Sequence, residues 1–141
     1  MTRGEIERLV EDARIGWRTR DADLLVARCA EDCVVESPVH GLIKGRARIA
    51  EIFRAWFSAF PDVQFEATDL VAEDDRAVMF WTVTGTHNAE FSGFPATGRA
   101  FQIRGASLYT FSHTQIVHER RLYDFTALLM QIGVLKAKPA P

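Results

Sequence analysis

Apolar side chains recur along the chain with two spacings, one typical of helices and one typical of strands. The clearest helical pattern covers residues 47–60 and stops before Pro61, with apolar residues three and four positions apart at Ile49, Ile52, Phe53, Trp56, Phe57 and Phe60. A capping-box pattern followed by apolar residues at helical spacing predicts a first helix over residues 2–18. Asp21 is suited to cap a second helix over residues 22–29.

Runs of β-branched and aromatic residues then predict four strands, over residues 63–71, 76–84, 101–111 and 115–123. Earlier in the chain, a short strand is expected at Val34 and Val35, followed by a loop with the sequence HGLIKG. A last helix over residues 125–132 is expected to end at Gly133. Helices followed by antiparallel strands indicate an α+β fold, in which a curved sheet wraps around three N-terminal helices and leaves its concave face as a pocket.

The segment between the second and third of these strands, residues 85–99, is longer than a tight hairpin requires. Its sequence, GTHNAEFSGFPATGR, combines glycines and a proline with the ionisable residues His87, Glu90 and Arg99 and with two phenylalanines. Two interpretations are open. The segment forms a lid over a pocket, or it is a packed surface loop with both phenylalanine side chains turned inward.

Size and charge narrow the class of protein. The 141 residues fit one domain, expected over residues 1–135, with residues 136–141 as a flexible tail. Lysine and arginine total 17 against 19 acidic residues, and the basic residues are dispersed, which argues against a nucleic-acid partner. Since the apolar runs are short and the N-terminus is charged, we expect no membrane segment and a cytoplasmic protein.

The residue types that bind metals do not occur at ligand spacing. Cys29 and Cys33 match neither a zinc pair nor the redox pair with two intervening residues, so we interpret them as small buried apolar residues. The four histidines are far apart in the sequence. No metal site is predicted.

Several short motifs together resemble one family. They are Phe60-Pro61-Asp62, then Gly85-Thr86-His87, Glu90-Phe91, Gly93, Pro95 and Thr97-Gly98-Arg99, and finally Asp124 with Gln131-Ile132-Gly133. In this combination, which covers roughly residues 45 to 135, the chain resembles the SnoaL-like polyketide cyclases, members of the superfamily of nuclear transport factor 2 and ketosteroid isomerase. The resemblance implies a cone-shaped α+β barrel with an apolar cavity, a homodimer, and no metal or organic cofactor.

The resemblance also implies a reaction, the intramolecular aldol ring closure of a small apolar carbonyl compound. In the cyclases one acidic residue at the end of the last strand is the general acid/base, and Asp124 matches its place. From the residues alone, Asp124 is equally suited to cap the helix that follows. His87 is a candidate for polarising a substrate carbonyl, or it is a structural residue of the loop.

The same superfamily supplies a negative comparison. By a rough alignment, Ser37 stands where ketosteroid isomerases carry their general-base aspartate, and Ala13 and Ser107 stand where they carry the two donors of the oxyanion hole. We therefore do not expect steroid-type isomerisation.

Candidate substrate-binding residues are Trp81, Phe57, Phe53, Phe91, Arg104 and Tyr109. Arg104 and Tyr109 are an odd number of positions apart on one strand, so at most one of them faces the pocket. The family usually has an aromatic residue where this chain has Arg120, which changes the polarity expected of the pocket. Two other functions stay open: a non-catalytic protein that binds a small apolar ligand, and a dimeric interaction domain.

Overall fold

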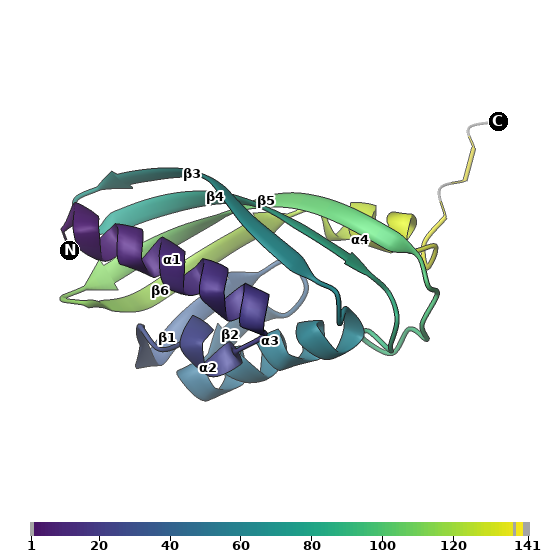
Figure 1. Ribbon diagram of the computed structural model, residues 1–141, viewed down its shortest axis with the longest axis horizontal. Helices are drawn as coiled ribbons and strands as arrows, with labels where there is room; N and C mark the ends of the chain where they lie inside the picture. The colour runs from purple at the N-terminus through teal and green to yellow at the C-terminus, as the bar shows by residue number, and fades with distance from the viewer. Residues whose placement is uncertain (1, 137, 140–141) are drawn as a thin grey trace.

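The computed structural model describes residues 2–136, 138 and 139, which form an α+β domain with one six-stranded sheet (Figure 1). Along the chain the elements are α1 (Arg3–Thr19), α2 (Ala22–Leu25), β1 (Cys29–Ser37), β2 (Gly41–Lys44), α3 (Arg46–Ala59), β3 (Gln64–Glu73), β4 (Arg76–Thr86), β5 (Ala100–Ser112), β6 (Gln115–Tyr123) and α4 (Phe125–Gln131). The strand order is β2-β1-β6-β5-β4-β3. Only β1 and β6 pair in parallel. The predicted fold class, with a mainly antiparallel sheet, is confirmed.

The long helices begin and end close to their predicted positions. In α1 the Thr2 hydroxyl accepts a hydrogen bond from the Glu5 amide at 3.2 Å, and the Glu5 carboxylate accepts one from the Thr2 amide at 2.6 Å. This reciprocal pair is the predicted capping box. At the other end of the chain, Gly133 follows α4 with a φ of 79°, a conformation that glycine adopts without strain.

The segment between α1 and α3 differs from the prediction. The second helix ends at Leu25, and residue 29 already belongs to β1, which is much longer than the two residues expected. The HGLIKG segment, predicted as a loop, contributes the strand β2. The pairing of β1 with β6 shifts register between Cys29 and Val34, and this bulge exposes Glu31 and Asp32. Because the bulge interrupts the alternation of apolar and polar residues, the pattern concealed most of the strand.

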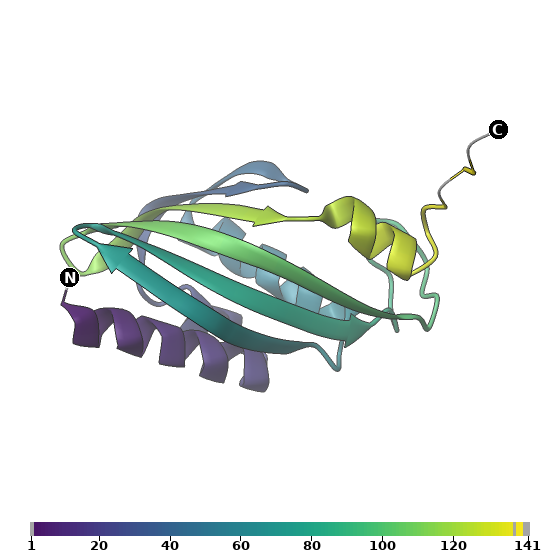
Figure 2. The same ribbon diagram turned by 90° about the horizontal axis from the view of Figure 1, so that it is seen from above.

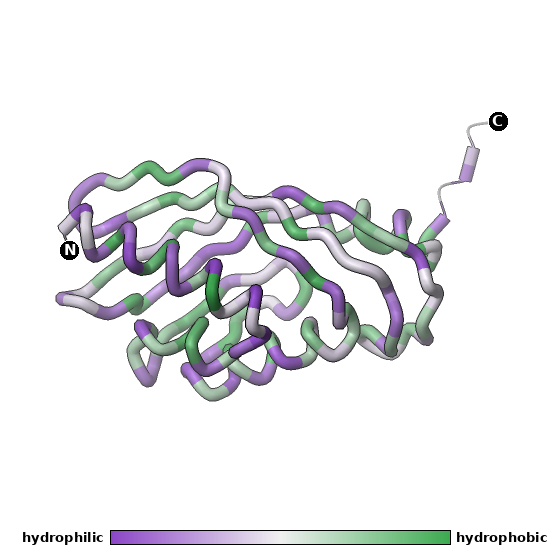
Figure 3. Tube along the Cα trace, in the orientation of Figure 1, coloured by the Kyte–Doolittle hydropathy of each residue, from purple (hydrophilic) through white to green (hydrophobic). Residues whose placement is uncertain are grey.

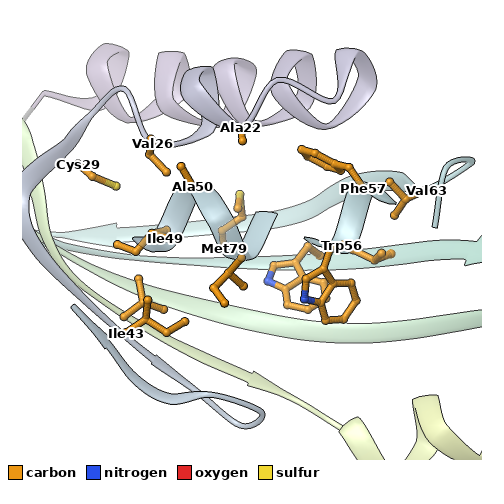
Figure 4. Close-up of a cluster of buried hydrophobic side chains, with 14 of the residues drawn as sticks. Ala22, Val26, Cys29, Ile43, Ile49, Ala50, Trp56, Phe57, Val63 and Met79 are labelled. Carbon is orange, nitrogen blue, oxygen red and sulfur yellow. The ribbon is translucent and has the colours of Figure 1, made fainter. Parts of the chain in front are cut away.

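Helices α1, α2 and α3 lie on one face of the sheet, and the view from above in Figure 2 shows the other face of β3 to β6 without a helix over it. The apolar stripe predicted for α3 is buried, with Ile49, Ile52 and Trp56 at most 8% exposed. Figure 4 shows part of this core, where Ile49 and Trp56 of α3 lie close to Met79 of β4. Figure 3 shows hydrophilic and hydrophobic residues alternating along the elements, as expected when one face of each element is buried and the other faces solvent.

The long segment after β4 is a packed loop, as the second interpretation predicted, although only Phe91 is buried and Phe94 is partly exposed. Phe91 is 3% exposed, and its ring centroid lies 4.9 Å from that of Phe60, which in turn lies 4.7 Å from Phe101. Backbone hydrogen bonds between His87 and Arg99 (2.9 Å) and between Gly98 and His87 (2.8 Å) hold the two ends of the loop together. The lid interpretation is wrong, because no residue of 85–99 lines the cavity described below.

The predicted tail over 136–141 falls partly on residues outside the described part of the chain. Residues 136, 138 and 139 belong to no helix or strand.

Phe60 has no exposed surface and joins α3, the loop and β5, so its replacement tests this packing. We expect Phe60→Ala to lower the free energy of unfolding by about 3–5 kcal/mol, the cost of truncating a buried phenylalanine. Urea denaturation followed by circular dichroism measures it. Met130→Ala, at a position 44% exposed on α4, is the control and should change stability by less than about 0.5 kcal/mol. A loss equal to that of the control would show that the cluster does not carry the fold.

Candidate functional site

A cavity lies between the inner face of the sheet and helices α1 and α3, extending to α2. Its volume is about 90 Å³. On the same scale one buried water needs only about 10–15 Å³, so the cavity has room for a small molecule. Aromatic and aliphatic side chains form its walls, and the aromatic ones are Trp17, Phe53, Trp56, Phe65, Trp81, Tyr109 and Tyr123. Apolar walls with a few polar groups are typical of small-molecule sites.

The polar groups of the cavity come mainly from the two strands in the middle of the sheet. Ser107 of β5 stands directly opposite Arg121 of β6, and Tyr109 of β5 stands opposite Glu119 of β6. All four side chains line the cavity. Since directly opposed residues have their Cβ atoms about 4.5–5.5 Å apart, strand pairing alone gathers two hydroxyls, one carboxylate and one guanidinium on one patch, which we call the polar floor.

Glu119 and Arg121 form a two-pronged ion pair on this floor. The Arg121 Nε donates to one carboxylate oxygen, and Nη2 donates to the other at 3.3 Å. The carboxylate side chain is 9% exposed and the guanidinium side chain 13%. Burial by itself lowers the pKa of Arg121, but the adjacent Glu119 carboxylate outweighs it and raises that pKa above its usual value. The guanidinium carbon also lies 4.8 Å from the centre of the Phe53 ring.

The two tyrosines of the chain both line the cavity and keep their protons. Burial raises the pKa of Tyr109, and the negative charge of Glu119 raises it further. Burial also raises the pKa of Tyr123. Both hydroxyls therefore remain hydrogen-bond donors at neutral pH.

Further polar side chains belong to the cavity, namely Asp12, Arg28, Ser37 and His40. Arg28 Nε donates to Asp12 Oδ2 at 2.8 Å, and both side chains are about a third exposed. His40, in the turn between β1 and β2, is exposed and lines the cavity, so this turn borders its opening. Partial burial lowers the pKa of His40, as do the positive charges of Arg48 and Arg121, so its imidazole is neutral near pH 7.

Asp124 does not point into the cavity, and this corrects the expectation from the sequence. Its side chain is exposed and accepts a hydrogen bond from the Ala127 amide at 2.9 Å, as the N-cap of α4. The reason is the alternation of β6, where Tyr123 is the last inward-facing residue before the backbone turns into the helix. The capping role is confirmed, whereas the catalytic role stays a prediction that this position does not support.

His87 is completely buried, but it is also outside the cavity lining. Its Nδ1 lies 3.0 Å from the Thr97 hydroxyl, across the packed loop, and its Nε2 has no hydrogen-bond partner among the described residues. It packs against Phe60. This position fits the structural alternative, and the proposed polarising role stays a prediction.

Three of the six candidate substrate-binding residues, Phe53, Trp81 and Tyr109, line the cavity. The other three, Phe57, Phe91 and Arg104, do not. The first two are buried in aromatic contacts elsewhere, and Arg104 lies on the outer face of β5, consistent with the expectation that it and Tyr109 face opposite sides.

Sequence reasoning missed the ion pair of the polar floor. Glu119, Arg121 and Tyr123 are two positions apart, which is the period of one strand face. If Tyr123 is taken to face inward, this spacing predicts that Glu119 and Arg121 face inward as well. Instead the sequence drew attention to Arg120, which points outward and donates to Glu36 at 3.1 Å.

Among the described residues, no group of three or more His, Cys, Asp and Glu side chains is placed to hold a metal ion. Cys29 and Cys33 are buried free thiols, as expected. No described helix is both long and apolar enough to span a bilayer.

Comparison with known proteins supports the resemblance found in the sequence. The model of one family, described as SnoaL-like polyketide cyclase, matches residues 7–132, which is most of the chain. None of the curated proteins compared with the chain matches it.

Several solved structures share the fold. AclR from Streptomyces galilaeus, described provisionally as a hydroxylase, is 25% identical with a TM-score of 0.83, and the match covers 98% of this chain and 91% of AclR. TsrD from Streptomyces laurentii is 23% identical with a TM-score of 0.86, over 96% of this chain and 99% of TsrD. IdmH from Streptomyces antibioticus, described provisionally as a polyketide cyclase, is 23% identical with a TM-score of 0.74, over 91% of this chain and 98% of IdmH.

The raised pKa values of the two tyrosines predict an alkaline titration. A free tyrosine ionises with a pKa of about 10, so at pH 10 the urea-unfolded protein should show about half of its maximum phenolate absorbance, and the folded protein should show less than the unfolded one. Because the unfolded chain releases these protons first, the free energy of unfolding should fall as the pH rises above about 10. Equal absorbance of folded and unfolded protein would contradict the burial of both hydroxyls.

Proposed function

The chain belongs to the family of SnoaL-like polyketide cyclases, and from that premise we propose that its cavity binds a small apolar carbonyl compound and catalyses an acid/base reaction on it. The reaction we propose is an intramolecular aldol ring closure or a closely related carbon deprotonation. The single observation that carries this proposal is the Glu119–Arg121 pair, a carboxylate and a cation at the floor of a mostly apolar cavity.

Each partner of the pair meets one requirement of the chemistry. Glu119 is the carboxylate of the floor and takes the proton from the carbon next to a carbonyl group. A free glutamate has a pKa of only about 4.3, so it removes such a proton only if the negative charge formed on the carbonyl oxygen is strongly stabilised. Arg121 supplies a positive charge on the same face, and its side chain is 13% exposed.

The remaining steps balance protons within the cavity. The enolate carbon attacks a second carbonyl group of the same molecule, a carbon–carbon bond forms, and the second oxygen becomes an alkoxide. The alkoxide takes a proton from a tyrosine hydroxyl of the cavity, since Tyr109 and Tyr123 are both protonated at neutral pH. The glutamic acid then returns its proton to that donor, directly or through water, which restores the starting state.

A second candidate function is a ligand-binding protein without turnover. One observation favours it: both oxygens of the Glu119 carboxylate are already hydrogen-bonded to Arg121, an arrangement that makes a carboxylate a weaker base. In this alternative the ion pair only anchors the carbonyl oxygen of the ligand, and the aromatic walls supply most of the affinity.

Deuterium exchange into 2-tetralone, an apolar ketone with an activated methylene group, separates the two functions. We expect the protein to accelerate exchange in D₂O over buffer, and Glu119→Gln to remove about 100-fold or more of that acceleration, the usual contribution of a general base. Proton NMR of the methylene signal measures the rate. Because all three tryptophans line the cavity, quenching of their fluorescence measures binding separately.

Two controls make this experiment decisive. Since breaking a buried ion pair destabilises a protein, each variant is first shown to be folded by circular dichroism and to bind 2-tetralone. Asp124→Asn keeps the helix cap and cannot take up a proton, so it should exchange as the parent does. Loss of exchange in Asp124→Asn but not in Glu119→Gln would return the catalytic role to Asp124. Binding without accelerated exchange in the parent would leave the ligand-binding function.

We also propose that the chain forms a homodimer through the outer face of the sheet. Strand pairing brings outward-facing apolar residues together there as one patch, which we call the outer patch: Val71, Val78, Phe80, Ala106, Leu108 and Leu122. Phe80 is 46% exposed and Leu122 is 63% exposed. Large apolar residues gathered on one exposed face are typical of protein interfaces.

The charges around the outer patch support a second copy of the chain as the partner. Glu66 and Asp69 lie on its β3 side, whereas Arg104 on β5 and Arg120 on β6, which also pairs with Glu36, lie toward the other side. A two-fold axis parallel to the strands places β3 of one copy over β6 of the other. The acidic side of each copy then faces the basic side of its partner, so the surface is complementary to itself.

Sedimentation equilibrium tests the dimer. We expect the mass of two chains for the parent and of one chain for Leu122→Glu, because the new carboxylate would be buried against β3 of the partner. Met130→Glu, which places the same charge at an exposed apolar position on α4, should remain dimeric. A monomeric parent, or a dimer that survives Leu122→Glu, would contradict this interface.

A further inference from the structure

The hydrogen-bonding role of Ser107 is constrained by its neighbour. Trp81 Nε1 donates to the Ser107 hydroxyl oxygen at 3.1 Å, and Ser107 is only 3% exposed. An indole nitrogen can only donate, so this bond uses the serine oxygen as an acceptor and leaves the serine proton free to be donated elsewhere. Because Ser107 lines the cavity, that proton is available to Tyr109, two positions along the same face, or to a bound ligand.

Gly105 makes this contact possible. It stands directly opposite Trp81 in the pairing of β4 with β5, and a Cβ at this position would lie 2.5 Å from the indole ring. The missing side chain therefore gives the ring the space to lie across β5 toward Ser107. The orientation of the serine thus depends on a glycine and a tryptophan that do not themselves carry the chemistry.

Arg121 supplies the second donor at the same place. It is the residue directly opposite Ser107 on β6, and Glu119 and the Phe53 ring fix its position. A guanidinium has five N–H groups, and the two bonds to Glu119 use only two of them. Among the described residues, Arg121 makes no other side-chain hydrogen bond, so the remaining donors can serve a ligand.

We propose that the Ser107 hydroxyl and the Arg121 guanidinium form one binding site for a negatively charged oxygen of the ligand, an enolate or a phenolate, with Trp81 as the positioning residue. This inference deepens the proposed function, since the enolate oxygen of the deprotonated substrate would occupy the site. It needs only binding, however, and no proton transfer to carbon. Two donors fixed in advance inside apolar walls favour the ionised form of an oxygen over its neutral form.

The probe for this site is 4-nitrophenol, whose neutral and ionised forms absorb at different wavelengths. Titration with the protein is carried out at a single pH near the pKa of the free probe, so that the protein's own groups do not change charge during the measurement. The absorption spectrum gives the ionised fraction of the bound probe. We expect the parent to bind the phenolate about tenfold or more in preference to the phenol, as expected for hydrogen bonds to a charged group.

Ser107→Ala removes one donor and should reduce this preference by about tenfold or more. Ser107→Thr keeps the hydroxyl and should retain most of the preference. Trp81→Phe keeps an aromatic wall but removes the hydrogen bond to the serine, so it should reduce the preference for the phenolate less than Ser107→Ala does. The double variant should reduce that preference no further than Ser107→Ala alone. The neutral analogue 4-nitroanisole should bind the parent and Ser107→Ala equally, which a general disturbance of the cavity would not allow.

Three results would overturn the proposal: a parent that binds neither form of 4-nitrophenol, a parent that prefers the neutral phenol, or a Ser107→Ala variant that keeps the full preference for the phenolate. The outcome is separate from that of the exchange experiment. A protein that binds the phenolate as described but does not exchange 2-tetralone would retain this oxyanion site and lose the proposed catalysis.

Discussion

The structure depends on one constraint: a bent six-stranded sheet has a single inner face, and three helices of unequal length have to cover it. Helices α1 and α3 pack at the two sides of this face, and the side chains between them leave a space over β5 and β6. Had those side chains filled the space, the inner face would be only a core. The incomplete cover turns the middle of the sheet into the floor of a cavity.

The charged groups on that floor are tolerated because of their geometry. Removing a carboxylate and a guanidinium from water costs several kcal/mol for each ion, and the cost is offset only when the two charges meet with well-formed hydrogen bonds. Glu119 and Arg121 satisfy this condition with two hydrogen bonds, and the Phe53 ring adds a favourable contact with the cation. Because of this cost, a buried ion pair adds little to the net stability of the fold. Its presence in a cavity therefore points to a function.

Aromatic packing and a helix cap stabilise the opposite end of the sheet. Phe60, Phe91 and Phe101 form an aromatic cluster that holds the long loop after β4, and Asp124 caps the helix that follows β6. Local rules explain both features, since a buried phenylalanine anchors a loop and an aspartate before a helix satisfies its free amides. The residues that looked chemically most interesting in the sequence therefore stabilise this end, while the cavity lies over the middle of the sheet.

Local patterns were sufficient for most of the elements, because capping residues, helical periodicity and β-branched runs act within a few residues along the chain. The α+β class, the long helices and the four later strands could be read from them, and so could the opposite orientations of Arg104 and Tyr109. Such patterns could not reveal β2 or the full length of β1, since the bulge after Cys29 breaks the alternation and β1 pairs with β6 from the far end of the chain.

The composition of the cavity was decided by tertiary structure alone. Whether Asp124 or Glu119 faces the interior depends on where the register of β6 against β5 ends, and whether Ser107 meets Trp81 depends on the space above Gly105. These are contacts between residues distant in sequence. The amino-acid sequence by itself thus determined most of the helices and strands and the family that the chain resembles. The pairing of strands determined which side chains share the cavity, because only pairing fixes which residues of neighbouring strands stand opposite one another.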